Sequence, residues 1–178
     1  MPLASLQAPW RMEYIRSLEQ AGDPVSKTGC FLCDAVLTAG DAQERHRRHV
    51  LWTSEHCVVL MNKYPYTSGH LLVAPRDHLQ DLEAMSDAQL LDLQTQTVRA
   101  VRVLRHVMNP QAFNIGINLG RAAGAGLPGH LHQHIVSRWA GDTNFLSVVG
   151  EVRVIPHAMD QLWHELVAAM DELKIPIA

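Results

Sequence analysis

The pattern of apolar and polar positions predicts two pairs of β-strands. The short, β-branched runs "HCVVLMN" and "GHLLVAP" flank the polar segment "KYPYTSG", which is typical of two strands joined by a loop. The runs "AFNIGIN" and "HLHQHIV" predict a second pair, joined by the glycine-rich segment "LGRAAGAGLPG". Neighbouring strands with short connections pair antiparallel, so we expect a mainly antiparallel sheet.

Two stretches have the spacing of amphipathic helices. The first begins at Ser86, which has Gln89 three residues later as in a capping box, and ends before Asn109 and Pro110. Its periodic positions recur every three or four residues: Leu90, Leu93, Thr97, Val101, Leu104 and Met108. The second covers about Ala158 to Leu173, with one stripe formed by Met159, Leu162, Trp163, Leu166 and Met170. Strand pairs, one long helix and a C-terminal helix predict an α+β fold.

The length and composition fit one globular domain with a substantial core, because the chain has 178 residues and is 47% hydrophobic. Residues 1–29 have the character of an N-terminal extension. Within them, "WRMEYIRSLEQ" has room for one or two helical turns, and "GDPVSKTG" has the composition of a loop. We therefore expect a compact domain over residues 30–178 that includes the C-terminal helix.

Charge and hydropathy narrow the class of partner. The formal net charge of -3 gives no long-range attraction for nucleic acid or for an anionic membrane surface. The start of the chain, "MPLASLQAPWRMEYI", has no apolar run of signal-peptide length, and no later segment has the roughly 18 apolar residues of a membrane span. We expect a cytoplasmic protein that binds neither nucleic acid nor membrane.

Three histidines occupy alternate positions of the predicted last strand. His130, His132 and His134 would share one face of that strand, while the residues between them, including Gln133, point to the other. Same-face neighbours in a strand have Cα atoms about 6 to 7 Å apart, so two imidazoles can converge on one zinc ion, but the outer pair is too distant. We expect one histidine near a metal and the next two along a reaction groove.

The segment "CFLC" indicates a metal site. Cys30 and Cys33 have the spacing of a zinc knuckle, which needs two further ligands. The candidates are His46, His49, His56, His70, His78 and His130. His78 ends the second predicted strand, where it can meet His130, so these two would complete a four-ligand structural zinc site. His46 and His49 are rival ligands in a charged context more typical of a solvated face, and free thiols in a turn are the alternative to any metal.

The segment "HLHQHIV" resembles the His-x-His-x-His-x-x signature of the histidine triad (HIT) superfamily of nucleotide hydrolases and transferases. The segments "LMNKYPYTSGHLLVAPRDH", "FNIGINLG" and "HLHQHIVSRWAGDTNF" resemble successive blocks of its diadenosine tetraphosphate hydrolase and phosphorylase branch, in the same order. The resemblance covers roughly Cys30 to Ile155, and "APWRMEYI" is similar to a segment that precedes the domain in that branch. It implies a HIT-like fold.

The resemblance implies a role for each candidate site residue. His132 would be the nucleophile that attacks an α-phosphorus, His134 would contact the phosphate, and Asn62 would hold the ribose hydroxyls. His78 and His130 match the histidine ligands of members that carry the C-x-x-C pair. The phosphate path would be lined by Asn118, Gly124, Ala125, Gly126 and Leu127. Residue chemistry agrees, because a neutral imidazole is a nucleophile at pH 7 and glycines let backbone N–H groups approach phosphate.

We therefore predict nucleotidyl transfer or hydrolysis on dinucleoside polyphosphates through a covalent nucleotidyl-histidine intermediate. Water as acceptor makes a hydrolase and phosphate makes a phosphorylase; the branch favours the phosphorylase. A nucleoside phosphoramidase and a non-catalytic, zinc-stabilised nucleotide-binding module are the alternatives. Members of the family are commonly dimers, so we also expect a homodimer, formed through an exposed strand edge or the terminal helix.

Two positions depart from the family pattern. Gln133 stands where the family prefers an apolar residue, and we expect it to contact a neighbouring strand or subunit. Gly126, four residues before His130, stands where many hydrolases have a Gln or Ser that assists at the phosphate. The leaving-group step and the substrate class therefore stay open at this point.

Overall fold

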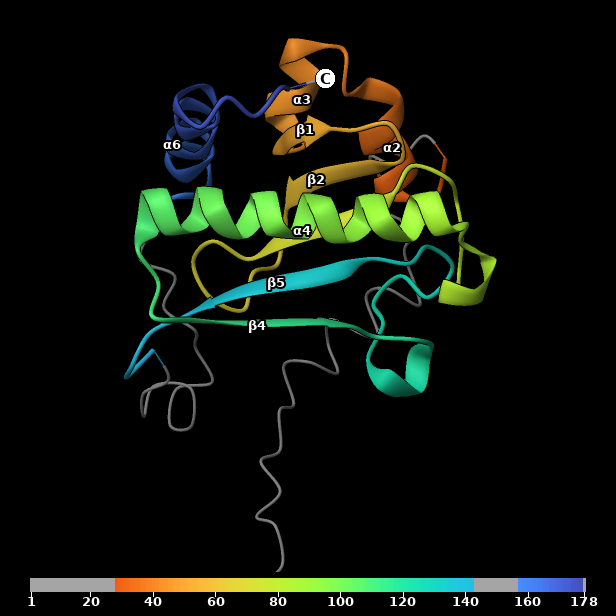
Figure 1. Ribbon diagram of the computed structural model, residues 1–178. Coiled ribbons are helices and arrows are strands. Elements are labelled where there is room, and N and C mark those ends of the chain that lie inside the picture. Colours follow the sequence, from red (N-terminus) through yellow and green to blue (C-terminus); the bar gives the residue numbers. More distant parts are fainter. Residues whose placement is uncertain (1–27, 143–156, 178) are drawn as a thin grey trace, which may run out of the picture.

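The computed structural model describes residues 28–142 and 157–177, which form a five-stranded sheet covered by helices (Figure 1). The strand order is β1-β2-β3-β5-β4, and every neighbouring pair is antiparallel. The strands are β1 Val50–Thr53, β2 Cys57–Met61, β3 Leu71–Pro75, β4 Ala112–Ile117 and β5 Gln133–Arg138. The predicted α+β fold with a mainly antiparallel sheet is confirmed.

The two predicted helices are present with nearly the predicted bounds. Helix α4 covers Asp87–Met108, begins with the capping box between Ser86 and Gln89, and ends at Asn109, whose φ of 45° lies in the left-handed region. Helix α6 covers Met159–Glu172. The structure adds elements that the sequence pattern did not predict, namely α2 Phe31–Thr38, α3 Ala42–Arg47, strand β1 and the short 3-10 turns Leu82–Ala84 and Arg121–Ala123. The helical turns predicted near the start of the chain lie outside the described residues.

The two faces of the sheet are covered differently. Helix α4 crosses one face (Figure 1), where the apolar side of the helix packs on Val59, Val73 and Ile135 and on residues of α6. On the other face, α2 packs over Val58, Leu60 and neighbouring residues. Leu72 belongs to this second cluster and pairs directly with His134 in register. His134 therefore lies on the face opposite α4, because directly paired residues point to the same side.

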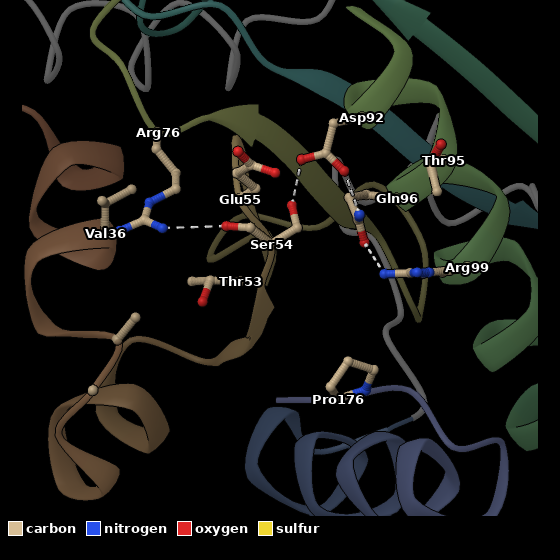
Figure 2. A pocket seen from close by; sticks show the side chains of 12 residues that line it. Val36, Thr53, Ser54, Glu55, Arg76, Asp92, Thr95, Gln96, Arg99 and Pro176 are labelled. Carbon is tan, nitrogen blue, oxygen red and sulfur yellow. Dashed lines mark hydrogen bonds between the residues drawn. The ribbon is translucent and has the colours of Figure 1, made fainter. Parts of the chain in front are cut away.

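A polar link joins α4 to the turn between β1 and β2 (Figure 2). The carboxylate of Asp92 accepts hydrogen bonds from Ser54 Oγ at 2.6 Å, His56 N at 3.0 Å and Gln96 Nε2 at 2.6 Å. Burial alone would raise the pKa of Asp92, but these hydrogen bonds outweigh it and hold the pKa below its usual value. The link borders a cavity of about 680 Å³ that none of the predicted site residues lines.

Candidate active site and metal centre

The structure corrects the expected backbone of the histidine segment. Strand β5 begins only at Gln133, so His130 and His132 precede it and only His134 lies within it. The partner strand β3 ends at Pro75, and Leu131 N donates to Leu79 O in the loop beyond that strand at 2.7 Å. This hydrogen bond therefore holds the histidine segment in place, although its first residues lie outside the sheet.

The hydrogen bonds of His132 fix its tautomer. Its Nδ1 lies 2.8 Å from the carbonyl oxygen of His130, and a carbonyl can only accept, so Nδ1 carries the proton. The lone pair of the neutral ring is then on Nε2. Burial lowers the pKa of His132, against the smaller opposing effect of that hydrogen bond, so the ring is neutral at pH 7. The arrangement presents a neutral imidazole nitrogen able to attack an electrophile.

His134 is oriented by a second, buried histidine. Tyr66 N donates to His70 Nδ1 at 3.1 Å, so His70 holds its proton on Nε2 and donates it to His134 Nδ1 at 3.0 Å. A neutral His134 therefore carries its own proton on Nε2. The rings of His132 and His134 lie 4.9 Å apart, which places a nucleophile beside a hydrogen-bond donor.

Asn62 belongs to the same network. Its amide nitrogen lies 3.2 Å from His70 Nδ1, and its oxygen accepts from Tyr64 N at 3.0 Å. The sequence reasoning considered His70 only as a metal ligand and missed this role. The preceding Gly69 has a φ of 73°, and a Cβ there would lie 2.6 Å from Met108 Sδ, so the turn that leads to His70 requires glycine.

The glycine-rich loop lies beside the start of β5. Gly124 adopts a left-handed conformation with φ 91°, and its carbonyl accepts from Asn118 Nδ2 at 3.5 Å. Gly124 N and Ala125 N donate within the loop, to Arg121 O and Gly120 O. Among the described residues, the N–H groups of Gly126 and Leu127 make no backbone hydrogen bond. They therefore have no backbone acceptor there, and the lining of the phosphate path by residues 124–127 stays a prediction.

The four predicted metal ligands come together. One ligand atom from each of Cys30, Cys33, His78 and His130 lies within 4.8 Å of every other. His130 Nδ1 is 3.3 Å from Cys30 Sγ and 3.5 Å from Cys33 Sγ, and His78 Nδ1 is 3.2 Å from Cys33 Sγ. A tetrahedral zinc ion with bonds of about 2.3 Å to sulfur and about 2.0 Å to nitrogen separates its ligands by roughly 3.3 to 3.8 Å, so the residues fit it.

Neighbouring groups leave the ligand atoms of this cluster available to a cation. His130 Nε2 lies 2.9 Å from Pro75 O, so it carries the proton and leaves Nδ1 for a metal. Helix α2 holds both cysteines at its start, where Cys33 N donates to Cys30 Sγ. Burial first, and then the adjacent Cys30, raises the pKa of Cys33 to about 11, so a cation is needed to make the thiolate at neutral pH.

Two other sequence expectations are corrected. The rival ligands His46 and His49 lie away from the cysteine cluster, where both approach Asp160 of α6. The side chain of Gln133 was expected at a neighbouring strand or subunit, but its hydrogen bonds go to helix α4. It is buried against α4, where it donates to Thr97 Oγ1 at 2.8 Å and accepts from Gln94 Nε2 at 3.2 Å.

Comparison with known sequences supports the family that the histidine segment indicates. The HIT domain family matches residues 43–141, a range that contains the histidine triad but neither Cys30 nor Cys33. The chain is 36% identical over 165 residues to AP-4-A phosphorylase of Mycobacterium tuberculosis, covering 88% of this chain and 79% of that protein. It is 32% identical over 93 residues to an asymmetrical bis(5'-nucleosyl)-tetraphosphatase of Schizosaccharomyces pombe, covering 52% of this chain and 50% of that protein.

A solved structure gives the same result for the fold. A Zn-bound histidine triad family protein from Mycobacterium smegmatis matches with a TM-score of 0.65 and 27% sequence identity, covering 84% of this chain and 98% of that one. The chain belongs to the HIT family, whose signature it carries around His132. The family predicted from the sequence is confirmed.

Proposed function

We propose that this protein transfers the nucleotidyl group of a dinucleoside polyphosphate through a covalent intermediate on His132. The observation that carries the proposal is the tautomer of this ring, which is neutral, anchored through Nδ1 and has its lone pair on Nε2 beside His134. The names of two relatives, a phosphorylase and a tetraphosphatase, support dinucleoside tetraphosphates as the substrate class. The reaction has two displacement steps.

In the first step, the lone pair of His132 Nε2 attacks the α-phosphorus of the substrate. An N–P bond forms, the bond from phosphorus to the bridging oxygen breaks, and the remaining nucleotide leaves. The ring becomes cationic, and the His130 carbonyl that accepts from Nδ1–H stabilises that charge. His134 Nε2–H and the amides of Gly126 and Leu127 donate to the phosphoryl oxygens, where negative charge increases.

In the second step, an oxygen of the acceptor attacks the same phosphorus and the N–P bond breaks. The electron pair returns to His132 Nε2, which restores the neutral ring, and where water is the acceptor its surplus proton is released to solvent. Inorganic phosphate as acceptor converts an adenylyl group to ADP, whereas water converts it to AMP. We expect phosphate to be the acceptor, in line with the 36% identical AP-4-A phosphorylase.

Product analysis tests both the activity and the acceptor. The protein is incubated with diadenosine tetraphosphate with and without inorganic phosphate, and the nucleotides are separated. ADP and ATP formed only when phosphate is present support a phosphorylase, whereas AMP and ATP formed without phosphate identify a hydrolase. Absence of all products, with ammonia released from adenosine phosphoramidate, assigns the site to a phosphoramidase. Binding without any turnover leaves a nucleotide-binding module.

The cysteine and histidine cluster holds a structural Zn²⁺ in this proposal. Four protein ligands complete a tetrahedral shell, so no position stays open for substrate or water. When bound, the ion supplies rigidity: it fixes His130, whose carbonyl orients His132. A zinc-bound relative of 27% identity supports the choice of metal.

The protein also forms a homodimer through β4 in this proposal. Strand β4 is at the end of the strand order, and in the described chain no strand pairs with its outer side. Ile115 on this strand is 48% exposed, so the open edge presents an apolar side chain. Ile115→Lys should give a monomer by light scattering, whereas Leu37→Lys, at a position of α2 that is 72% exposed, should not. Monomeric wild-type protein contradicts the dimer.

None of the helices in the described residues is long and apolar enough to cross a membrane. The cytoplasmic location and the absence of a nucleic-acid partner stay predictions from the sequence.

A further inference from the structure

A buried carboxylate follows the cysteine pair. Asp34 comes directly after Cys33 in the first turn of α2, and its side chain is only 1% exposed. Its Oδ2 lies 3.5 Å from Nη1 of Arg48, a residue at the end of α3 with a side chain that is 8% exposed. Asp34 is not one of the four residues whose ligand atoms come together. Because a buried charge is costly unless it is paired, this ion pair keeps the carboxylate in place and links α2 to α3.

The other oxygen of Asp34 holds the turn that leads into α2. Its Oδ1 accepts a hydrogen bond from Thr28 N at 3.2 Å and another from Thr28 Oγ1 at 3.0 Å. The two residues are six positions apart, so these bonds close a loop that contains both Cys30 and Cys33. Gly29 within this loop has a φ of 78°, which a glycine adopts without strain. The side chain of Asp34 therefore fixes the backbone from which both thiols extend.

The hydroxyl group of Thr28 also contacts the backbone of Cys30. It accepts from Cys30 N at 3.2 Å and lies 3.0 Å from Cys30 O, which is a second acceptor for the hydroxyl proton. Cys30 is the N-cap residue of α2, and its Sγ accepts from Cys33 N at 3.4 Å. A chain of contacts therefore runs from the buried ion pair through Thr28 to Cys30, and from Cys30 to Cys33.

We propose that Asp34 and Thr28 are positioning residues for the metal centre. They hold Cys30 and Cys33 in their ligand conformation before Zn²⁺ binds, so less conformational entropy is lost on binding and the affinity for the ion is higher. Side chains that orient metal ligands without binding the ion typically account for about 10- to 100-fold in affinity. This inference rests on the structural zinc ion proposed above and does not depend on the reaction at His132.

Replacement of Thr28 tests the inference without disturbing the core. Thr28 is exposed, whereas loss of the Asp34 carboxylate would leave the buried Arg48 without its partner on α2. Thr28→Val removes the hydroxyl at nearly constant size, and it should weaken zinc binding by about 10- to 100-fold. Thr28→Ser keeps the hydroxyl and should bind zinc as the wild-type protein does. Competition with a chromophoric chelator for zinc, carried out with the full chain, measures each dissociation constant.

Thr38 supplies the matched control. Its Oγ1 donates to the backbone carbonyl of Asp34 at 2.8 Å, in the last turn of α2 and at the opposite end of that helix from the cysteines. Thr38→Val therefore removes a hydroxyl hydrogen bond from the same helix and should leave the zinc affinity unchanged. Thermal unfolding of the metal-free proteins should show similar losses for Thr28→Val and Thr38→Val. A difference in zinc affinity between them then reports on the metal centre rather than on the stability of the helix.

Cobalt distinguishes positioning from ligation. Thr28→Val should keep the thiolate-to-metal charge-transfer absorption of the Co²⁺-saturated protein, because no ligand is lost, but it should need more Co²⁺ to reach saturation. Zinc affinity of Thr28→Val that equals that of the wild type, or that is weakened no more than in Thr38→Val, overturns the inference and leaves the zinc site standing. Wild-type protein that binds no zinc overturns both, and the product analysis with diadenosine tetraphosphate is independent of either result.

Discussion

Backbone groups decide what each imidazole of the candidate site can do. Pro75 O accepts from His130 Nε2, His130 O accepts from His132 Nδ1, and Tyr66 N donates to His70 Nδ1. Each of these bonds fixes which ring nitrogen carries the proton and which keeps its lone pair. As a result, three chemically identical side chains differ in function. The lone pair of His130 faces two sulfurs, the lone pair of His132 is suited to attack phosphorus, and the ring of His70 donates to His134.

Replacing the proposed nucleophile gives the most direct prediction at the residue scale. His132→Ala should lower kcat by about 10³-fold or more, because no other side chain there combines this tautomer with this position. Labelled substrate quenched with wild-type protein should leave an adduct that is labile in acid and stable in base, and the variant should leave none. Arg121→Ala should keep the adduct. An adduct that persists in His132→Ala assigns the nucleophile elsewhere.

His70 should act through His134 rather than on substrate. His70→Phe removes the donor to His134 Nδ1 and should lower kcat by roughly 10²-fold through misplacement of that ring, with KM changed little. His70→Gln keeps an amide donor and should recover part of the loss. Steady-state kinetics of both variants, with thermal unfolding as a check on folding, measure this. Equal losses in kcat for Phe and Gln would argue against positioning.

At the scale of elements, local signals predicted the longer elements and missed the short ones. Helix α4 carries its capping box and several turns of periodicity, so its bounds follow from the sequence. Helices α2 and α3, with 8 and 6 residues, are too short to show a period, and the charges of "RHRRHVLW" hide β1. The start of β5 depends on where its partner β3 ends, which is tertiary information.

The candidate site likewise contains residues that local patterns predicted and residues that only tertiary contacts place. The grouping of Cys30, Cys33, His78 and His130 was predicted because cysteine spacing and a strand end give local signals. The contact of His70 with His134 spans 64 residues and depends on the register between β3 and β5, which no local pattern specifies. The side-chain contact of Gln133 with α4 was likewise missed, because an exposed amide and a buried one look alike in a sequence.

The buried amide of Gln133 makes a testable link between α4 and the histidine segment. Thr97→Val removes the acceptor of the Gln133 amide and should cost about 1 to 3 kcal/mol, because a buried donor is left unsatisfied. Adding Gln133→Leu, which removes the unsatisfied donor, should recover part of that loss. A double-mutant cycle by urea unfolding measures the coupling, with exposed Thr95→Val as control. Additive effects of the two changes would show that the residues do not interact.

Asp92 should make the stability of α4 packing depend on pH. Its folded-state pKa is lowered, so its contribution is complete above the unfolded pKa of about 3.9 and is lost as pH falls through the folded value. Asp92→Asn should therefore be less stable at pH 7 by about 1 kcal/mol, and the difference from wild type should shrink below pH 4. Unfolding in urea between pH 3 and 7 measures it. A constant difference across this range would contradict the linkage.

At the scale of the whole molecule, the main hydrophobic core and the candidate active site lie on opposite faces of the sheet. Helices α4 and α6 build the main core on one face of the sheet, and the histidines lie on the other. The matched HIT region begins at residue 43, so the cysteines on α2 lie before it and reach His130 across 97 and 100 residues of sequence. The cluster therefore ties the segment before the matched region to the segment of the three histidines.

Removal of metal from the cysteine cluster should lower the stability of the fold, because the ion links these two segments. Chelation should lower Tm by about 10 °C, since an ion held at about 1,000 times its dissociation constant contributes roughly 4 kcal/mol, while kcat at low temperature should change only a few-fold. Cys30→Ser should lower Tm similarly and lose zinc. Cys57→Ala is the matched control, because Cys57 is buried apart from the cluster. Zinc-free wild-type protein whose Tm is insensitive to chelator would show that the four residues hold no structural ion.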